Sequence, residues 1–408
     1  MKKIILCALG VLLTAALIFV VVWFSSHRNV NPPKPNTSSS PTTSSSGTSD
    51  PTETSKPVIQ LNTPMVSISL PIIVETDTAD DGTVIFRRTF QDVVLSIPDV
   101  DITKTVTLDL LQRMDANSQT LSSLQQSAFA DYSGQTPWMP YYYKILYSPM
   151  RIDQTVLSLY GVEDVFGNMQ AGQNGISVTY NLLTGSAMTL AGVLTEESTA
   201  ADTLLTALLT ALESKKEEYM LFDDYAQIVS GRFQTQLQQE TGWYFSGEGL
   251  CLFFSPYDIA PNAAGTVVAT VPYTELNGVL QDIYFPAEQA NYAGNLATMP
   301  FDSENLDGFT HFSELITDPD APRHLLHTDG VLYNLTVEQG QWIAGVRFQK
   351  DATIYSANLL APEDAFVLRA ALPESQSSLR IAYLNNGNDY CFYLTVDGTG
   401  NMVFTPVE

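Results

Sequence analysis

The chain has 408 residues, with 44 acidic and 19 basic side chains, a formal net charge of −25 and 45% hydrophobic residues. This hydrophobic content is sufficient for folded domains, and the length predicts two or three of them. The scarcity of Lys and Arg argues against nucleic-acid binding, because affinity for phosphates depends on these residues. Three cysteines argue against a disulfide-rich scaffold and against a cysteine-rich zinc module.

An uncharged apolar run from Ile4 to Phe24 follows Lys2 and Lys3 at the start of the chain. A helix over this run is about 31 Å long, close to the roughly 30 Å thickness of the bilayer hydrocarbon. We therefore favour an uncleaved anchor within residues 1–28 over a cleaved signal peptide, whose apolar region is shorter. The positively charged flank predicts a cytoplasmic amino terminus, so most of the chain is expected to be extracytoplasmic.

Residues 29–60 are predicted to be a disordered linker. Between Thr37 and Ser55, 14 of 19 residues are Ser or Thr. A segment of this composition buries too little apolar surface to offset the entropy of ordering it. We expect it to hold the folded part away from the membrane.

Residues 61–195 and 196–300 are predicted to be two α+β modules. In the first, the pattern predicts one helix over 101–126 and strands over 65–74, 83–95, 141–147, 154–160 and 175–183. In the second, Leu204, Leu208 and Leu212 form an apolar stripe on a helix over 199–219. The apolar run 250–254 predicts a central strand, and 266–271 predicts its neighbour.

Residues 301–408 are predicted to be an all-β, sandwich-like domain. Apolar residues alternate along several short segments, and turn signals such as Asn386-Gly387 separate them. The expected strands cover 331–337, 342–348, 353–359, 366–372, 379–384, 390–396 and 402–407. The predicted fold class is therefore a mixed-sheet α+β ectodomain followed by this all-β domain, with one amino-terminal transmembrane helix.

Two stretches carry a resemblance to a known extracytoplasmic architecture. The first is Trp243-Tyr-Phe-Ser-Gly-Glu-Gly-Leu-Cys-Leu-Phe-Phe-Ser-Pro-Tyr-Asp-Ile-Ala-Pro-Asn-Ala-Ala-Gly265, followed by Val271-Pro-Tyr-Thr-Glu-Leu276. It resembles the outer domain of the anti-sigma factor RsiV, which is also present in the peptidoglycan deacetylase PdaC. The second, Val178-Thr-Tyr-Asn-Leu-Leu-Thr-Gly-Ser-Ala-Met-Thr-Leu190, resembles the companion module that precedes that domain.

The resemblance implies a membrane-tethered surface protein of a Gram-positive bacterium. In RsiV the domain binds lysozyme and triggers proteolysis that frees a sigma factor. This chain shows neither the sigma-binding part nor the deacetylase domain, so we expect a non-enzymatic ligand-binding or sensing module. The expected partner is a cationic, lysozyme-like protein, which an acidic surface attracts, or a cell-wall component.

The segment from Pro256 to Gly265 has two interpretations. Its prolines and small residues are typical of turns that allow close backbone packing before the next strand. Alternatively, Tyr257, Asp258 and Asn262 line a binding edge. These three residues are our candidate binding residues.

The sequence shows no motif that points to catalysis, and no cofactor is expected. It lacks a Gly-x-Ser-x-Gly elbow, a His-Glu-x-x-His pair and a phosphate-binding loop. His324, His327 and Asp329 lie close enough in sequence to consider a metal, but they enter a predicted strand rather than a helix. The alternative functions are a cell-wall-modifying enzyme with an unrecognised site and a surface adhesion protein acting through residues 301–408.

Overall fold

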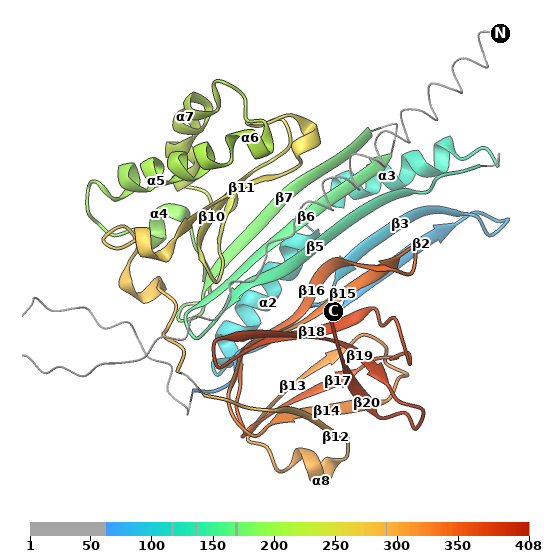
Figure 1. Ribbon diagram of the computed structural model, residues 1–408. Coiled ribbons are helices and arrows are strands. Elements are labelled where there is room, and N and C mark those ends of the chain that lie inside the picture. Colours follow the sequence, from blue (N-terminus) through green and yellow to red (C-terminus); the bar gives the residue numbers. More distant parts are fainter. Residues whose placement is uncertain (1–62, 116–117, 135–136, 168–169, 291, 408) are drawn as a thin grey trace, which may run out of the picture. The chain divides into compact units, whose positions relative to one another are not determined.

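The protein, seen in a computed structural model (Figure 1), is described over residues 63–407 apart from 116–117, 135–136, 168–169 and 291. The predicted anchor and the whole of the predicted linker lie outside these residues. Among the described residues, no helix combines the length and apolar character that crossing a membrane requires. Strands hold 43% of the residues and helices 23%, which confirms a mixed α+β fold with several sheets.

A six-stranded sheet carries the long central strands of Figure 1. Its strands, in spatial order, are β2 (Ile72–Thr78), β3 (Val84–Gln91), β5 (Tyr141–Ile152), β6 (Val156–Gly167), β7 (Gln170–Asn181) and β8 (Ser186–Ala187). All neighbouring pairs are antiparallel except β3 and β5, which are parallel. Helix α2 (Val100–Asp115) and helix α3 (Ser118–Asp131) bury their apolar residues in the same core as this sheet.

The helix predicted over 101–126 corresponds to α2 and α3, which lie on either side of residues 116–117, outside the described part of the chain. Asp99 fixes the start of α2, since its Oδ1 accepts hydrogen bonds of 2.9 Å from the backbone N–H groups of Asp101 and Ile102. Val106 and Leu110 on α2 are fully buried, as the apolar spacing predicted.

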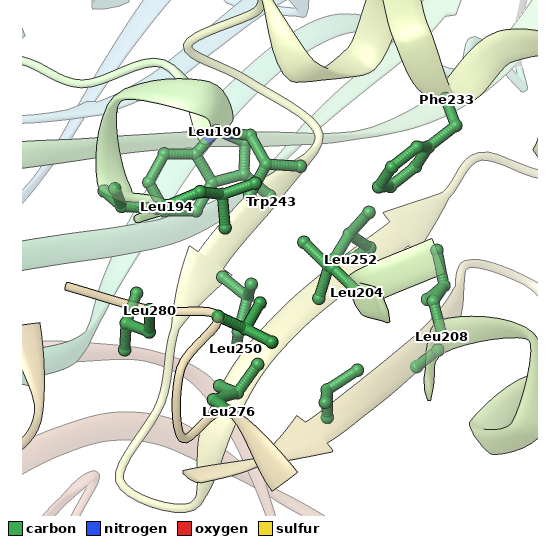
Figure 2. Packing of buried hydrophobic residues seen from close by; sticks show 14 of the residues in the cluster. Leu190, Leu194, Leu204, Leu208, Phe233, Trp243, Leu250, Leu252, Leu276 and Leu280 are labelled. Carbon is green, nitrogen blue, oxygen red and sulfur yellow. The ribbon is translucent and has the colours of Figure 1, made fainter. Parts of the chain in front are cut away.

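A three-stranded antiparallel sheet forms a second core with four helices. The strands, in spatial order, are β11 (Val267–Pro272), β10 (Gly249–Phe254) and β9 (Trp243–Phe245). The helices are α4 (Leu190–Val193), α5 (Ala200–Ser214), α6 (Lys216–Tyr219) and α7 (Tyr225–Leu237). Figure 2 shows Leu204 and Leu208 of α5 and Phe233 of α7 around Leu250 and Leu252 of β10. The predicted stripe on α5 is confirmed, whereas α7 was missed.

Three short 3-10 helices belong to this region, one between β10 and β11 and two after β11. They are η1 (Asn262–Ala264), η2 (Tyr273–Glu275) and η3 (Asp282–Tyr284). The edge strand β9 meets the six-stranded sheet, because the Phe245 backbone N–H donates a 2.8 Å hydrogen bond to the Ser158 hydroxyl of β6. The two sheets are thus joined by a buried polar contact as well as by apolar packing.

A seven-stranded sheet and a four-stranded sheet share a third core. The first contains, in spatial order, β20 (Met402–Pro406), β19 (Asn388–Val396), β18 (Leu379–Asn385), β15 (Leu332–Ile343), β16 (Arg347–Leu360), β1 (Ser67–Ser69) and β4 (Val94–Ser96). The second contains β12 (Leu296–Pro300), β14 (Arg323–Thr328), β17 (Asp364–Arg369) and β13 (His311–Ile316), with the short helix α8 (Ser303–Leu306) after β12. Tyr355 of β16 stacks on Phe366 of β17, with ring centroids 4.2 Å apart.

The seven-stranded sheet takes strands from both ends of the described chain. β1 pairs with β16, placing Ser67 opposite Ala357, and β4 continues beyond β1. The described residues belong to one compact unit, and the predicted boundaries at 195 and 300 fall within it.

Several predicted strands were wrong in extent. The strand over 83–95 is broken into β3 and β4, which lie in different sheets. The strand over 65–74 is broken into β1 and β2, with Pro71 between them, because proline has no backbone N–H to donate to a sheet. The strand over 342–348 is a hairpin turn instead. Ala344 and Gly345 have positive φ angles of 51° and 70°, and Trp342 faces Phe348 across the hairpin.

Candidate functional site

The candidate binding residues lie on the loop that joins β10 to β11. All residues of β10 except Phe254 are buried, so the strand is a fixed support for the loop. Within the loop, Ile259 and Ala260 are also buried. The backbone N–H of Phe222 donates a 2.9 Å hydrogen bond to the Ile259 carbonyl, which ties the loop to the segment before α7.

Tyr257 projects from this anchored loop. Its φ angle is +69°, a conformation that side-chain-bearing residues rarely adopt, and the residue is 69% exposed. The Tyr257 N–H donates a 3.1 Å hydrogen bond to the Ala260 carbonyl, which closes the turn. A large aromatic side chain held exposed at a strained backbone position is typical of functional loops.

The carboxylate of Asp258 is engaged in hydrogen bonds that stabilise the loop. Its Oδ2 accepts a 2.8 Å hydrogen bond from the Ser255 backbone N–H, and its Oδ1 accepts a 2.7 Å hydrogen bond from Arg232 of α7. Asn262 starts η1 and is exposed. Across the described residues, no hydrogen bond joins the side chains of Tyr257, Asp258 and Asn262. The loop therefore presents Tyr257 and Asn262, whereas Asp258 fixes its shape.

The region of the sequence that includes the loop is strongly acidic. Residues 193–274 contain eleven acidic and three basic side chains. Arg232 pairs with Asp258, while Lys215 lies over the ring of Tyr219 at 5.7 Å and Lys216 over that of another tyrosine at 5.9 Å. The few cations of this region are thus engaged locally, and a net negative field remains for a cationic ligand.

Arg151 at the end of β5 connects the six-stranded sheet to the region that carries the loop. Its side chain is 5% exposed, and Nη2 lies 2.6 Å from Asp153 Oδ2. Nη1 donates hydrogen bonds of 2.8 Å to the Tyr273 hydroxyl and 2.6 Å to the Tyr284 carbonyl. The guanidinium also lies 5.3 Å from the centroid of the Phe245 ring. The sequence did not reveal the role of Arg151, because nothing near a single arginine in an apolar strand indicates which distant residues it contacts.

The arrangement of the histidines does not favour a metal site. His324 and His327 both lie in β14, and an odd spacing in a strand places side chains on opposite faces. His324 is buried, and burial lowers the pKa of its imidazole. Asp329 instead accepts hydrogen bonds from Asn295. Within the described part of the chain, no three His, Cys, Asp or Glu residues are grouped to hold a metal.

Two cysteines and one buried carboxylate are further reactive groups in the described part of the chain. Cys251 is buried in β10, and both Cys251 and Cys391 are free thiols. Asp364 contacts His311 at 3.0 Å, and its other oxygen accepts a 2.8 Å hydrogen bond from the Ala361 backbone, closing the turn before β17. Burial raises the pKa of Asp364 above its ordinary value.

A family model matches the part of the chain that carries the β10–β11 loop, and it does not confirm the resemblance to the RsiV and PdaC type. Residues 193–274 match the profile of DUF3298, described as a protein of unknown function, so the chain contains a DUF3298 domain. A DUF3298 structure from Bacteroides fragilis NCTC 9343 is similar over 53% of this chain and 94% of its own, with 14% identity and a TM-score of 0.38. Another, from Pseudomonas aeruginosa PAO1, covers 56% and 100%, with 13% identity and a TM-score of 0.38. No curated protein matches the sequence.

Proposed function

We propose that the protein is a non-enzymatic, ligand-binding module of the RsiV ectodomain type, held at the outer face of a membrane. In this proposal residues 4–24 form the single anchor, and residues 29–60 are the spacer. The DUF3298 domain captures a cationic, lysozyme-like protein through the β10–β11 loop, and the sandwich-like β domain follows it. A cell-wall component is the alternative ligand.

The proposal rests on Tyr257, which is exposed at a strained backbone position within an acidic part of the sequence. The turn already fixes the backbone of Tyr257, so the loop loses little conformational entropy when the ring enters a pocket on a partner. The negative field of residues 193–274 accelerates encounters with a cationic protein and weakens as salt screens it. In this proposal Tyr257 contacts the partner directly, and the carboxylates of residues 193–274 attract the cationic partner before contact.

Calorimetric titration of the full chain with hen egg-white lysozyme, in non-ionic detergent, tests this proposal. Saturable binding is expected at about 25 mM salt, and weaker binding at about 150 mM. Tyr257→Ala should weaken binding by roughly tenfold, the scale of an aromatic anchor. Tyr292→Ala is the matched control, because Tyr292 is also exposed, at 40%, and lies outside the loop. Absence of saturable binding at low salt would reject lysozyme as the ligand.

A further inference from the structure

A cluster of three aromatic rings lies at one end of the seven-stranded sheet. Trp342 of β15 and Tyr393 of β19 have ring centroids 5.1 Å apart, at an interplanar angle of 41°. Phe348 of β16 packs edge-on against both, at 6.1 Å from Trp342 and 5.6 Å from Tyr393. Trp342 and Tyr393 are only partly buried, so they form an aromatic platform that solvent reaches.

Polar contacts fix the orientation of this platform. The Trp342 indole N–H donates a 3.0 Å hydrogen bond to the Ser377 carbonyl. Behind it, the Arg380 guanidinium lies 4.7 Å from the centroid of the Phe348 ring. Arg380 also pairs with Glu338, whose other oxygen lies 2.7 Å from Lys350 Nζ. The platform is therefore organised before any ligand arrives, which lowers the entropic cost of binding.

The platform lines a groove with a volume of about 400 Å³, within the size range of small-molecule sites. One wall is the β15–β16 hairpin tip, and the other is the loop that leads from β17 to β18. Gln376 joins the walls, since its Nε2 donates a 3.0 Å hydrogen bond to the Gly345 carbonyl. Glu374, Ser375 and Thr405 supply further polar groups. Gln376 has a φ angle of +52°, a strained conformation that the closed loop maintains.

We propose that this groove binds a neutral, β-1,4-linked pyranose oligosaccharide. In β-1,4-linked glucose and N-acetylglucosamine the hydroxyls are equatorial, so each ring has an apolar C–H face that stacks on an aromatic platform. The hydroxyl edges then meet amide, carboxylate and hydroxyl groups on the walls. The described lining residues include one carboxylate, Glu374, and no Lys or Arg, which disfavours an anionic polymer. Pro406, at the edge strand β20, lacks the N–H that strand addition by a peptide would use.

Isothermal titration of the full chain with chitotetraose and with cellotetraose tests the proposal. Saturable binding of at least one sugar is expected. Trp342→Ala should weaken it by about tenfold or more, whereas Trp342→Phe, which keeps a stacking ring, should retain most of the affinity. Glu374→Ala should weaken binding by a smaller factor. Tyr257→Ala should leave it unchanged, which separates this site from the proposed lysozyme contact.

Three outcomes would overturn the proposal. They are failure of both sugars to bind, full affinity in a folded Trp342→Ala variant, and loss of sugar binding in a folded Tyr257→Ala variant. If Trp342→Ala does not fold, as judged by circular dichroism, Tyr393→Ala and Trp342→Phe decide the question. Equal losses in these two variants would contradict stacking on the Trp342 ring.

Discussion

Replacing Arg151 by Met tests whether this residue joins the six-stranded sheet to the DUF3298 region. Methionine keeps an unbranched apolar stem of similar length but removes the guanidinium. The substitution therefore leaves the Tyr273 hydroxyl and the Tyr284 carbonyl without their donor, and it deprives Asp153 of its buried cation.

The size of the effect follows from the contacts that remain. Removing one member of a buried ion pair costs about 3–5 kcal/mol of folding free energy. Asp153 is 21% exposed, and its Oδ1 still accepts 2.8 Å hydrogen bonds from the backbones of Thr155 and Val156. These contacts reduce the penalty, so Arg151→Met should lower the free energy of unfolding by about 3 kcal/mol.

Urea unfolding followed by circular dichroism measures this loss as a lower midpoint at an unchanged slope. Arg323→Met is the matched control, because its ion pair with Glu314 is 39% and 29% exposed and should contribute about 0–1 kcal/mol. A loss for Arg151→Met that equals the control would refute the view that Arg151 joins the two regions.

Other substitutions test the loop, the core and the surface charges. Tyr257→Gly should be about 1 kcal/mol more stable than Tyr257→Ala in thermal unfolding, because only glycine adopts a φ of +69° without strain; equal stability would argue against strain. Leu204→Ala should cost about 2–5 kcal/mol, since Leu204 is fully buried, and a loss below 1 kcal/mol would contradict tight packing. Lys350 and Arg380, acting against desolvation, lower the pKa of Glu338 below its ordinary 4.5. The contribution of Glu338 to the free energy of unfolding is present above pH 4.5 and is lost as the pH falls through the lowered pKa. The urea midpoints of Glu338→Gln and of the unsubstituted chain should therefore converge in acid; a difference between them that stays constant with pH would refute this linkage.

Strong apolar patterns allowed parts of the fold to be predicted from the sequence. The run 250–254 was predicted as a central strand, and β10 lies between two partners with almost every residue buried. The alternation of Tyr390, Phe392 and Leu394 likewise predicted β19. The apolar run and the alternation are local signals, so the sequence was sufficient to predict both strands, although Tyr390 is exposed in the structure.

The missed features depend on contacts between distant residues. β1 has three residues and exists as a strand only because it pairs with β16, almost 300 positions further along the chain. The Ala344-Gly345 turn lacks the usual Asn-Gly signal. In the candidate site, the role of Asp258 depends on Arg232, which lies on the unpredicted helix α7. The positive φ of Tyr257 belongs to a turn that its N–H closes on the Ala260 carbonyl, and no local signal in the sequence indicated it.

Hydrogen–deuterium exchange of the full chain, with and without lysozyme at low salt, tests the proposed ligand surface most directly. The proposed mode of binding predicts slower exchange in residues 255–265, centred on the backbone around Tyr257, and little change in the Trp342 groove. Protection confined to other surfaces, or none at a saturating lysozyme concentration, would contradict it.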